Sequence, residues 1–173
     1  MTVPSRLQGL ILAVHPYSRG FGWAIFESAI APADWGIVET KNDRNARCLE
    51  RVEKIMSQYE PSVLVLEQFD RRPSRRSARV KKLGMALSHL AVNRGIALAI
   101  YSRAAIRTYF KSVGGASRYE IAKIISLHIH VFRKRMPKSR RAWEGEDCRQ
   151  SLFDAAALAM THLGVTGNRP LSV

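Results

Sequence analysis

The amino-acid sequence predicts one α/β domain built on a mixed five-stranded sheet with helices on both faces. Three observations favour this class: short apolar runs of strand length open the chain, stretches with helical spacing alternate with strands in the second half, and turn residues separate them. A length of 173 residues, 46% of them hydrophobic, is enough for one well-buried core. We therefore expect residues 1–173 to form a single domain.

Three strands and a helix are expected in the first half of the chain. The run LQGLILAVH at 7–15 is apolar and of strand length, and we expect Pro16 to end it. After a tight turn, residues 21–27 alternate large apolar with smaller side chains and return antiparallel, and residues 34–40 can add a third strand. Residues 45–59 carry apolar side chains at helical spacing, which predicts a helix packed on that sheet.

The second half of the chain alternates strands with helices. Further strands are expected at 62–67 and 96–101. Helices are expected at 78–94, 104–111, 119–130 and 150–163, with Gly164 ending the last one. Three antiparallel strands that lead into parallel α/β units are the layout of a ribonuclease H-like sheet.

The charge of the chain points to a polyanionic partner. It carries 28 Lys and Arg against 14 Asp and Glu, a formal net charge of +14. Twenty of the cations are Arg, whose planar guanidinium suits bidentate contacts with phosphate better than the Lys ammonium does. The composition therefore favours a nucleic acid as the partner.

Cysteine usage and hydropathy exclude several other classes. Cys48 and Cys148 are too few and too far apart in sequence for a disulfide scaffold or a zinc module, so we expect a reducing, cytoplasmic location. No apolar run reaches the roughly 18 to 20 residues of a membrane span. The first residues also lack the features of a signal peptide, and no membrane partner is expected.

Three polar residues interrupt apolar segments where function would be expected. In open α/β sheets functional groups collect at the carboxyl ends of the central strands, where His15 and Glu67 follow apolar runs. Asp154 lies on an otherwise apolar helix, where burial of a carboxylate is costly without a partner or a metal. Purely structural roles stay open: a hydrogen bond to turn amides for Glu67, a satisfied imidazole for His15 and an exposed position for Asp154.

Five segments carry a resemblance to a known family, in the same order along the chain. They are ILAVHPYSRGFGWAIFE, SVLVLEQF, LGMALSHLAVNRGI, KSVGGASRYEIAKII and SLFDAAALAMTH. Together they resemble the RuvC-type Holliday-junction resolvases of the ribonuclease H and retroviral-integrase superfamily. The resemblance implies that Glu67 and Asp154 match acidic metal ligands of a catalytic site. It also implies that His15 stands where the family has a bridging Asp, and Ser151 where it has an acidic residue or, in some members, His.

The family chemistry that the resemblance implies uses two metal ions. Two Mg²⁺ ions about 4 Å apart need several carboxylate oxygens, one of them shared, to activate water on a phosphodiester. A neutral imidazole at His15 brings one nitrogen and no charge, so this residue and Ser151 both weaken the site, and Mn²⁺ would tolerate His15 better than Mg²⁺. Asp70, Glu146 and Asp147 are possible substitute ligands, with plain surface solvation as the alternative.

Basic residues on both sides of these candidates form the expected nucleic-acid surface. One cluster follows Glu67 and a second precedes the last helix, while Lys111 and Arg118 match a family loop that touches the DNA backbone. Phe69 is a candidate for stacking on an unpaired base, or else caps the core. The two clusters consist of Arg71, Arg72, Arg75, Arg76, Arg79, Lys81 and Lys82, and of Arg133, Lys134, Arg135, Lys138, Arg140 and Arg141.

The resemblance implies a structure-selective DNA endonuclease that uses Mg²⁺ or Mn²⁺, needs no small-molecule cofactor, and acts on branched or junction DNA as a homodimer. The helix at 78–94, with Met85 and His89, would be the dimer element. A catalytically weak or inactive relative that binds branched DNA as a scaffold or recombination factor is one alternative. An RNA-processing nuclease of the same superfamily is another.

Overall fold

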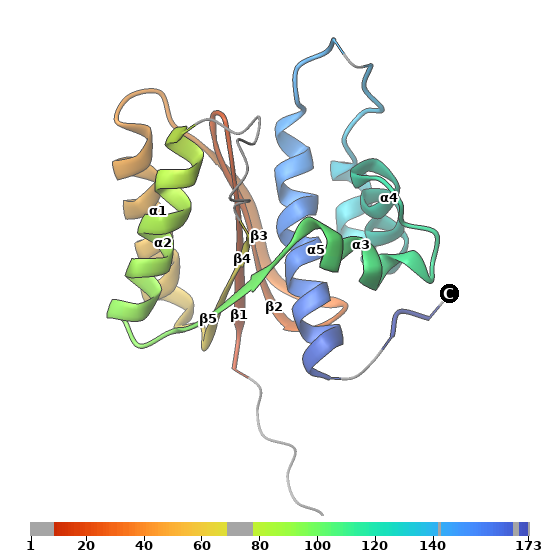
Figure 1. Cartoon of the computed structure of the whole chain (residues 1–173), viewed down its shortest axis with the longest axis horizontal. Helices are drawn as coiled ribbons and strands as arrows, with labels where there is room; N and C mark the ends of the chain where they lie inside the picture. The colour runs from red at the N-terminus through yellow and green to blue at the C-terminus, as the bar shows by residue number, and fades with distance from the viewer. Residues whose placement is uncertain (1–8, 69–77, 142, 168–169, 173) are drawn as a thin grey trace, which may run out of the picture.

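The computed structural model describes residues 9–68, 78–141, 143–167 and 170–172 of the chain. The strands are β1 (Ile11–Tyr17), β2 (Gly20–Ser28), β3 (Ala31–Glu39), β4 (Val63–Glu67) and β5 (Ala97–Tyr101). The helices are α1 (Arg44–Tyr59), α2 (Ala78–Asn93), α3 (Arg103–Lys111), α4 (Arg118–His128), the 3₁₀ helix η1 (His130–Arg135) and α5 (Cys148–Thr166). The strands form one sheet in the order β3-β2-β1-β4-β5 (Figure 1).

The pairing within this sheet is mixed, as the sequence predicts. β1 pairs antiparallel with β2, and β2 pairs antiparallel with β3. β1 and β4 are parallel, and so are β4 and β5. The mixed five-stranded ribonuclease H-like sheet is thereby confirmed.

The predicted end of the first strand at Pro16 is wrong, because β1 continues to Tyr17. Pro16 lies opposite Phe21 of β2, and Tyr17 lies opposite Gly20, which closes a hairpin with a two-residue turn. The pairing of β1 with β4 runs only from Ile11 to Ala13. At Pro16 the strand therefore has β2 alone as its paired neighbour, and a proline without an N–H is tolerated there.

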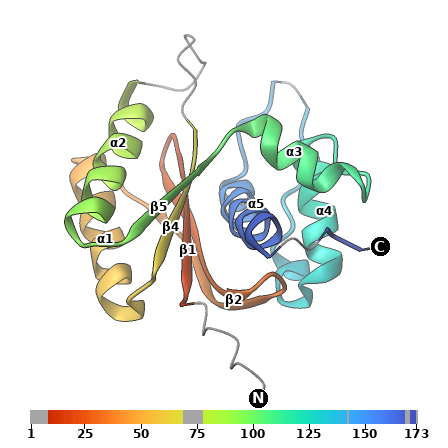
Figure 2. The ribbon, with the colours of Figure 1, turned by 60° about the horizontal axis from the view of Figure 1, so that its bottom comes forward.

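Helices cover both faces of the sheet and make two apolar layers. α1 and α2 pack on one face, whereas α3, α4 and α5 pack on the other (Figures 1 and 2). Leu12 and Val14 of β1 belong to the core under α1 and α2. Ile11 and Ala13 belong to the core under α5. β1 is buried on both faces, which explains why its sequence is a continuous apolar run.

α5 approaches β2 closely at the point where Gly22 meets the backbone of Ser151. A Cβ atom on Gly22 of β2 would lie 2.3 Å from the backbone carbonyl of Ser151, so only glycine allows this approach. Gly22 is the register partner of His15 on β1. The contact therefore brings the first turns of α5 next to His15.

The predicted end of the last helix at Gly164 is also wrong, because α5 continues to Thr166. A Cβ on Gly164 would lie 2.1 Å from the ring of Tyr109 in α3. The glycine therefore serves helix packing and does not end the helix.

Both cysteines are free, Cys48 in the core and Cys148 at the start of α5. The fold is therefore not held by a disulfide, in line with the cysteine spacing. None of the helices in the described part of the chain is long and apolar enough to cross a membrane.

Candidate functional site

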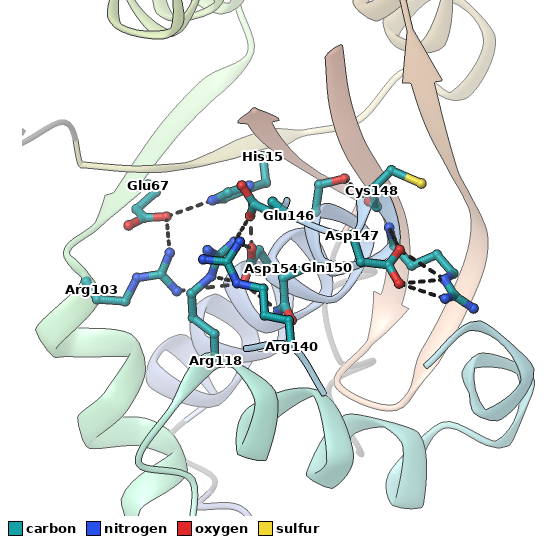
Figure 3. A network of polar contacts seen from close by, with 12 residues as sticks. His15, Glu67, Arg103, Arg118, Arg140, Glu146, Asp147, Cys148, Gln150 and Asp154 are labelled. Atoms are coloured by element: carbon teal, nitrogen blue, oxygen red, sulfur yellow. Dashed lines mark hydrogen bonds and ion pairs between the residues drawn. The ribbon is translucent and has the colours of Figure 1, made fainter. Parts of the chain in front are cut away.

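The structure brings together the three residues singled out as site candidates. His15 comes from β1, Glu67 from the last position of β4 and Asp154 from α5 (Figure 3). The Nε2 atom of His15 lies 3.0 Å from Oε2 of Glu67, and its Nδ1 atom lies 3.7 Å from Oδ2 of Asp154. All three side chains are buried. Residues far apart in sequence thus meet near the carboxyl ends of β1 and β4. Their catalytic or ligating roles stay a prediction.

Two arginines enter this group from the helices that follow the sheet. Arg103, the first residue of α3, donates from Nη2 to Oε2 of Glu67 at 2.9 Å, and its Nη1 lies 3.7 Å from Oδ1 of Asp154. Arg118, the first residue of α4, hydrogen-bonds both carboxylate oxygens of Asp154, with Nε to Oδ1 at 3.3 Å. It also donates to Oε1 of Glu146 at 2.6 Å. These six residues, His15, Glu67, Arg103, Arg118, Glu146 and Asp154, are called the arginine–carboxylate network below.

Arg103 is not among the site residues that the sequence predicts. Its signal is its place, since it follows β5 directly and β5 runs parallel to β4. Tyr101, the last residue of β5, lies opposite Glu67. A cation two residues beyond the end of the neighbouring parallel strand is therefore positioned to reach that carboxylate.

The electrostatics of the network keep its central groups charged. Burial by itself would raise the pKa of Asp154, but its electrostatic interactions with His15, Arg118 and Arg103 outweigh it and hold this pKa below its usual value. Burial likewise favours the neutral form of Arg118, yet Asp154 and Glu146 outweigh it and raise the pKa of the guanidinium. Each of these two charges is therefore stabilised by a partner of opposite sign.

Two residues of the first turns of α5 complete the surroundings of Asp154. Gln150 donates from Nε2 to Oδ1 of Asp154 at 3.2 Å. Ser151, which the sequence resemblance places at an acidic position, is buried and donates its hydroxyl to the carbonyl of Cys148 at 2.6 Å. Its oxygen is therefore engaged with the backbone of its own helix and brings no charge to the site.

Of the two possible substitute ligands within the described residues, Glu146 joins the network, through Arg118. Asp147 instead caps α5, because its Oδ1 accepts from the backbone N–H of Arg149 at 3.0 Å. The side-chain hydrogen bond from Arg149 also lowers the pKa of Asp147 to about 2. Asp70 lies outside the described residues.

The donor set of the network does not fit a pair of divalent cations. Two Mg²⁺ or Mn²⁺ ions bring four positive charges and need several shared oxygens. Here the carboxylates of Glu67 and Asp154 are already bonded to guanidinium groups, and the third neighbour, His15, is an imidazole. Within residues 9–68, 78–141, 143–167 and 170–172, no group of three or more His, Cys, Asp and Glu side chains is arranged to hold a metal ion.

The first basic cluster is partly structural. The Nη2 atom of Arg79 donates to the carbonyls of Tyr17 at 2.9 Å and Ser18 at 2.6 Å, and Nη1 donates to Oδ1 of Asn45 at 3.0 Å. This arginine ties α2 to the β1–β2 turn, a role that the sequence did not indicate. Lys82 is exposed on α2 and Lys81 is half-buried there. The remaining candidates of this region lie outside the described residues: Phe69, Arg71, Arg72, Arg75 and Arg76.

The second basic cluster is exposed, and two of its loop residues, Lys138 and Arg140, line a cavity beside the network. Arg133, Lys134 and Arg135 are on η1, and Lys138, Arg140 and Arg141 are in the loop before α5. This loop forms one wall of a cavity of about 410 Å³ whose lining also includes Arg107, Arg118 and the start of α4. Lys111 is exposed at the end of α3. Positive side chains thus reach the network from α3 and α4, and those of the loop line the cavity beside it.

Solved structures of other proteins share this architecture. The chain is similar to RuvC of Thermus thermophilus, both alone and in complex with a Holliday junction substrate, at 18% identity and a TM-score of 0.67, over 94% of this chain and 99% of that chain. It is also similar to the yeast mitochondrial Holliday junction resolvase Ydc2, at 15% identity and a TM-score of 0.55, over 96% of this chain and 84% of that chain. No protein-family model and no curated protein sequence matches it. The chain thus has the ribonuclease H-like fold of the RuvC-type Holliday-junction resolvases.

Proposed function

We propose that the protein binds branched DNA such as a four-way junction and does not hydrolyse it by two-metal catalysis. The observation that carries the proposal is the arginine–carboxylate network, in which Arg103 and Arg118 supply the positive charge beside Glu67 and Asp154. The runner-up is the altered-site endonuclease that the resemblance implies.

Binding of branched DNA is supported by fold and by charge. Thermus thermophilus RuvC, which shares the fold, is known in complex with a Holliday junction substrate. The net charge of +14 supplies the phosphate-neutralising term that dominates affinity for DNA. Because backbone contacts carry little sequence information, selection of a branch would come from the shape of the DNA.

The network offsets the negative charge at the carboxyl ends of β1 and β4, so that a phosphate backbone can approach them. Unneutralised carboxylates at Glu67 and Asp154 would repel phosphate, whereas bonded guanidiniums offset their charge. The side chains of Arg103 and Arg118 are 24% and 35% exposed. Each guanidinium has five N–H donors, so those turned away from the carboxylates are available to phosphate.

A specific observation keeps the endonuclease as second candidate. Glu67 and Asp154 both remain at the site, buried on either side of His15. Hydrolysis there would require Arg103 to leave both carboxylates and a metal to replace it. The loss of its ion pairs makes this exchange costly.

We also propose that the protein is a homodimer whose interface is formed by α2 and β5. β5 is an edge strand of the sheet. The large apolar side chains Met85 and Val92 of α2 and Ile100 of β5 are 62%, 66% and 50% exposed. His89 is exposed on the same helix. A two-fold axis would bury this face against the same face of a second copy.

The experiment that tests the proposed function compares three labelled nucleic acids: a four-way junction, a linear duplex of the same sequence, and a structured RNA. Binding and cleavage are measured in EDTA, in Mg²⁺ and in Mn²⁺, with Glu67→Gln as a matched control. We expect salt-sensitive binding that favours the junction, without nicks in any metal. Symmetric nicks that disappear in Glu67→Gln would instead establish the endonuclease, and preferential cutting of the RNA would establish the RNA-processing alternative.

A further inference from the structure

We propose that the cavity beside the arginine–carboxylate network holds an unpaired DNA strand, with a phosphate bound by Arg107 and Lys138 and a neighbouring base stacked on Trp143. The inference deepens the proposed function and rests on it, since a branch point is where unpaired nucleotides arise. It adds a strand-binding site to a surface for which the sequence indicated only positive charge.

The cavity has the size and place that a nucleotide requires. Its volume of about 410 Å³ lies within the range of small-molecule sites. One wall is the start of α4 with Ser117 and Tyr119, and the opposite wall is the loop segment Pro137–Arg140 before α5. Stacked bases of a duplex cannot enter such a cavity, so a nucleotide that does enter it has left the stack.

The charge inside the cavity favours phosphate. Arg107 and Lys138 line it, and within the described part of the chain neither side chain forms an ion pair with a carboxylate, although the backbone N–H of Lys138 donates to Oδ2 of Asp147 at 3.3 Å. The acidic groups of the lining are both engaged, Glu146 with Arg118 at 2.6 Å and Asp147 with Arg149 at 2.6 Å. The two unengaged cations are therefore available for the backbone of a strand.

The loop that forms the wall also carries an exposed aromatic ring. Trp143 is 77% exposed, and the guanidinium of Arg141 lies 5.5 Å from its ring centroid. Arg140, which lines the cavity, donates to the carbonyl of Glu144 at 3.2 Å and so connects the wall to the turn that bears Trp143. An exposed indole next to cations is the arrangement on which unstacked bases pack in single-strand binding proteins.

Arg118 connects this cavity to the network. It lines the cavity and hydrogen-bonds Asp154 and Glu146. A strand in the cavity would therefore pass close to the network, where the junction is proposed to lie. The unpaired nucleotides would be those next to the branch.

The inference is tested with a labelled oligothymidylate and with a four-way junction that carries an unpaired thymidine segment. The variant Arg107→Ala/Lys138→Ala is compared with Arg51→Ala/Lys54→Ala, which removes the same charge from exposed positions of α1 on the opposite face of the sheet. We expect the cavity variant to make the slope of log K against log salt shallower by about 1.4 for the oligothymidylate, about 0.7 for each lost contact. The control variant should keep the wild-type slope, and equal slopes in the two variants would overturn the inference.

Variants of the indole give a second readout. Trp143→Ala should weaken oligothymidylate binding by about 5-fold or more, the value of one lost base–aromatic stack. Trp143→Phe should keep most of the affinity but lose the quenching of tryptophan fluorescence on binding. Wild-type affinity in Trp143→Ala would overturn the stacking role, and tighter binding of an oligouridylate would overturn the assignment to DNA.

The failure of this inference differs from the failure of the proposed function. If the wild-type protein selects the fully paired junction but the oligothymidylate does not bind, only the strand-binding cavity is wrong. If the wild-type protein does not distinguish the junction from the linear duplex, the proposed function itself is wrong.

Discussion

The guanidinium of Arg103 bridges Glu67 and Asp154, with Nη2 at 2.9 Å from Oε2 of Glu67 and Nη1 at 3.7 Å from Oδ1 of Asp154. These are the two carboxylates that the sequence resemblance predicts to be metal ligands. The guanidinium of Arg103 is covalently attached and stays protonated. It thus occupies the place where the resemblance implies exchangeable divalent cations. The consequences of this bridge can be measured.

Removal of the bridge should destabilise the fold. Arg103→Met leaves Glu67 buried with one ionic partner fewer, and we expect a loss of about 1–3 kcal/mol in the free energy of unfolding, measured by urea denaturation. Arg94→Met, which breaks the more exposed pair of Arg94 with Glu53, is the matched control and should cost at most about 1 kcal/mol. Equal costs for the two variants would mean that the bridge is no stronger than a surface ion pair.

The depressed pKa of Asp154 predicts a particular acid dependence of stability. A carboxylate whose pKa is lowered by folding stabilises the protein above its unfolded pKa and loses this contribution as the pH falls through the folded value. The free energy of unfolding should therefore fall below about pH 5 more steeply in the wild type than in Asp154→Asn. Parallel curves for the two proteins would show that Asp154 is not held ionised by its neighbours.

Asp147 should behave as a helix cap. Asp147→Ala should lower the free energy of unfolding by about 1 kcal/mol at pH 7, whereas Asp147→Asn keeps a capping oxygen and should cost less. Because Arg149 lowers the pKa of Asp147 to about 2, the benefit of the carboxylate is complete above the unfolded pKa and should disappear as the pH falls toward 2. An alanine variant as stable as the wild type would contradict the capping role.

A metal site should appear when acids are placed at the two positions that the resemblance assigns to acidic residues and the bridge is removed. The triple variant His15→Asp/Ser151→Asp/Arg103→Ala should be stabilised by Mg²⁺ or Mn²⁺, by about 2.7 kcal/mol at a metal concentration one hundred times Kd. The same metals should leave the Tm of the wild type and of His15→Asp/Ser151→Asp unchanged, since Arg103 remains in both. Equal stabilisation of the wild type would show that its donor set already accepts a divalent cation.

The proposed dimer interface predicts a change in mass in solution. Met85→Glu places a charge on the exposed apolar face of α2 and should convert the dimer to a monomer in analytical ultracentrifugation. Leu127→Glu is the matched control, because Leu127 is 65% exposed on α4, away from α2 and β5. A wild type that sediments as a monomer at every concentration would contradict the homodimer.

The sheet and three residues of the network could be predicted from sequence because their signals are local. Apolar runs that end in His15 and Glu67 mark buried strands, and the helical period around Asp154 marks a packed helix. Pro16 and Gly164 misled because each normally ends an element. Pro16 stays within β1 because it pairs with β2. Gly164 stays within α5 because its missing side chain leaves room for the ring of Tyr109.

The arginines of the network were harder to predict. The sequence predicts a DNA contact for Arg118 and no site role for Arg103, yet both bind carboxylates that lie 36 residues away in sequence. A long flexible side chain has many possible partners, and the choice among them is made by the packing of α3 and α4 beside the sheet. The same holds for Arg79, which binds the β1–β2 turn.

The most direct test of metal-independent junction binding measures the affinity for a labelled four-way junction in EDTA and in Mg²⁺ at matched ionic strength, and follows the integrity of the DNA strands in the same samples. We predict that the junction binds in EDTA, that Mg²⁺ does not tighten binding, and that the strands stay intact. Binding or strand cleavage that requires Mg²⁺ and is lost in Glu67→Gln would contradict it.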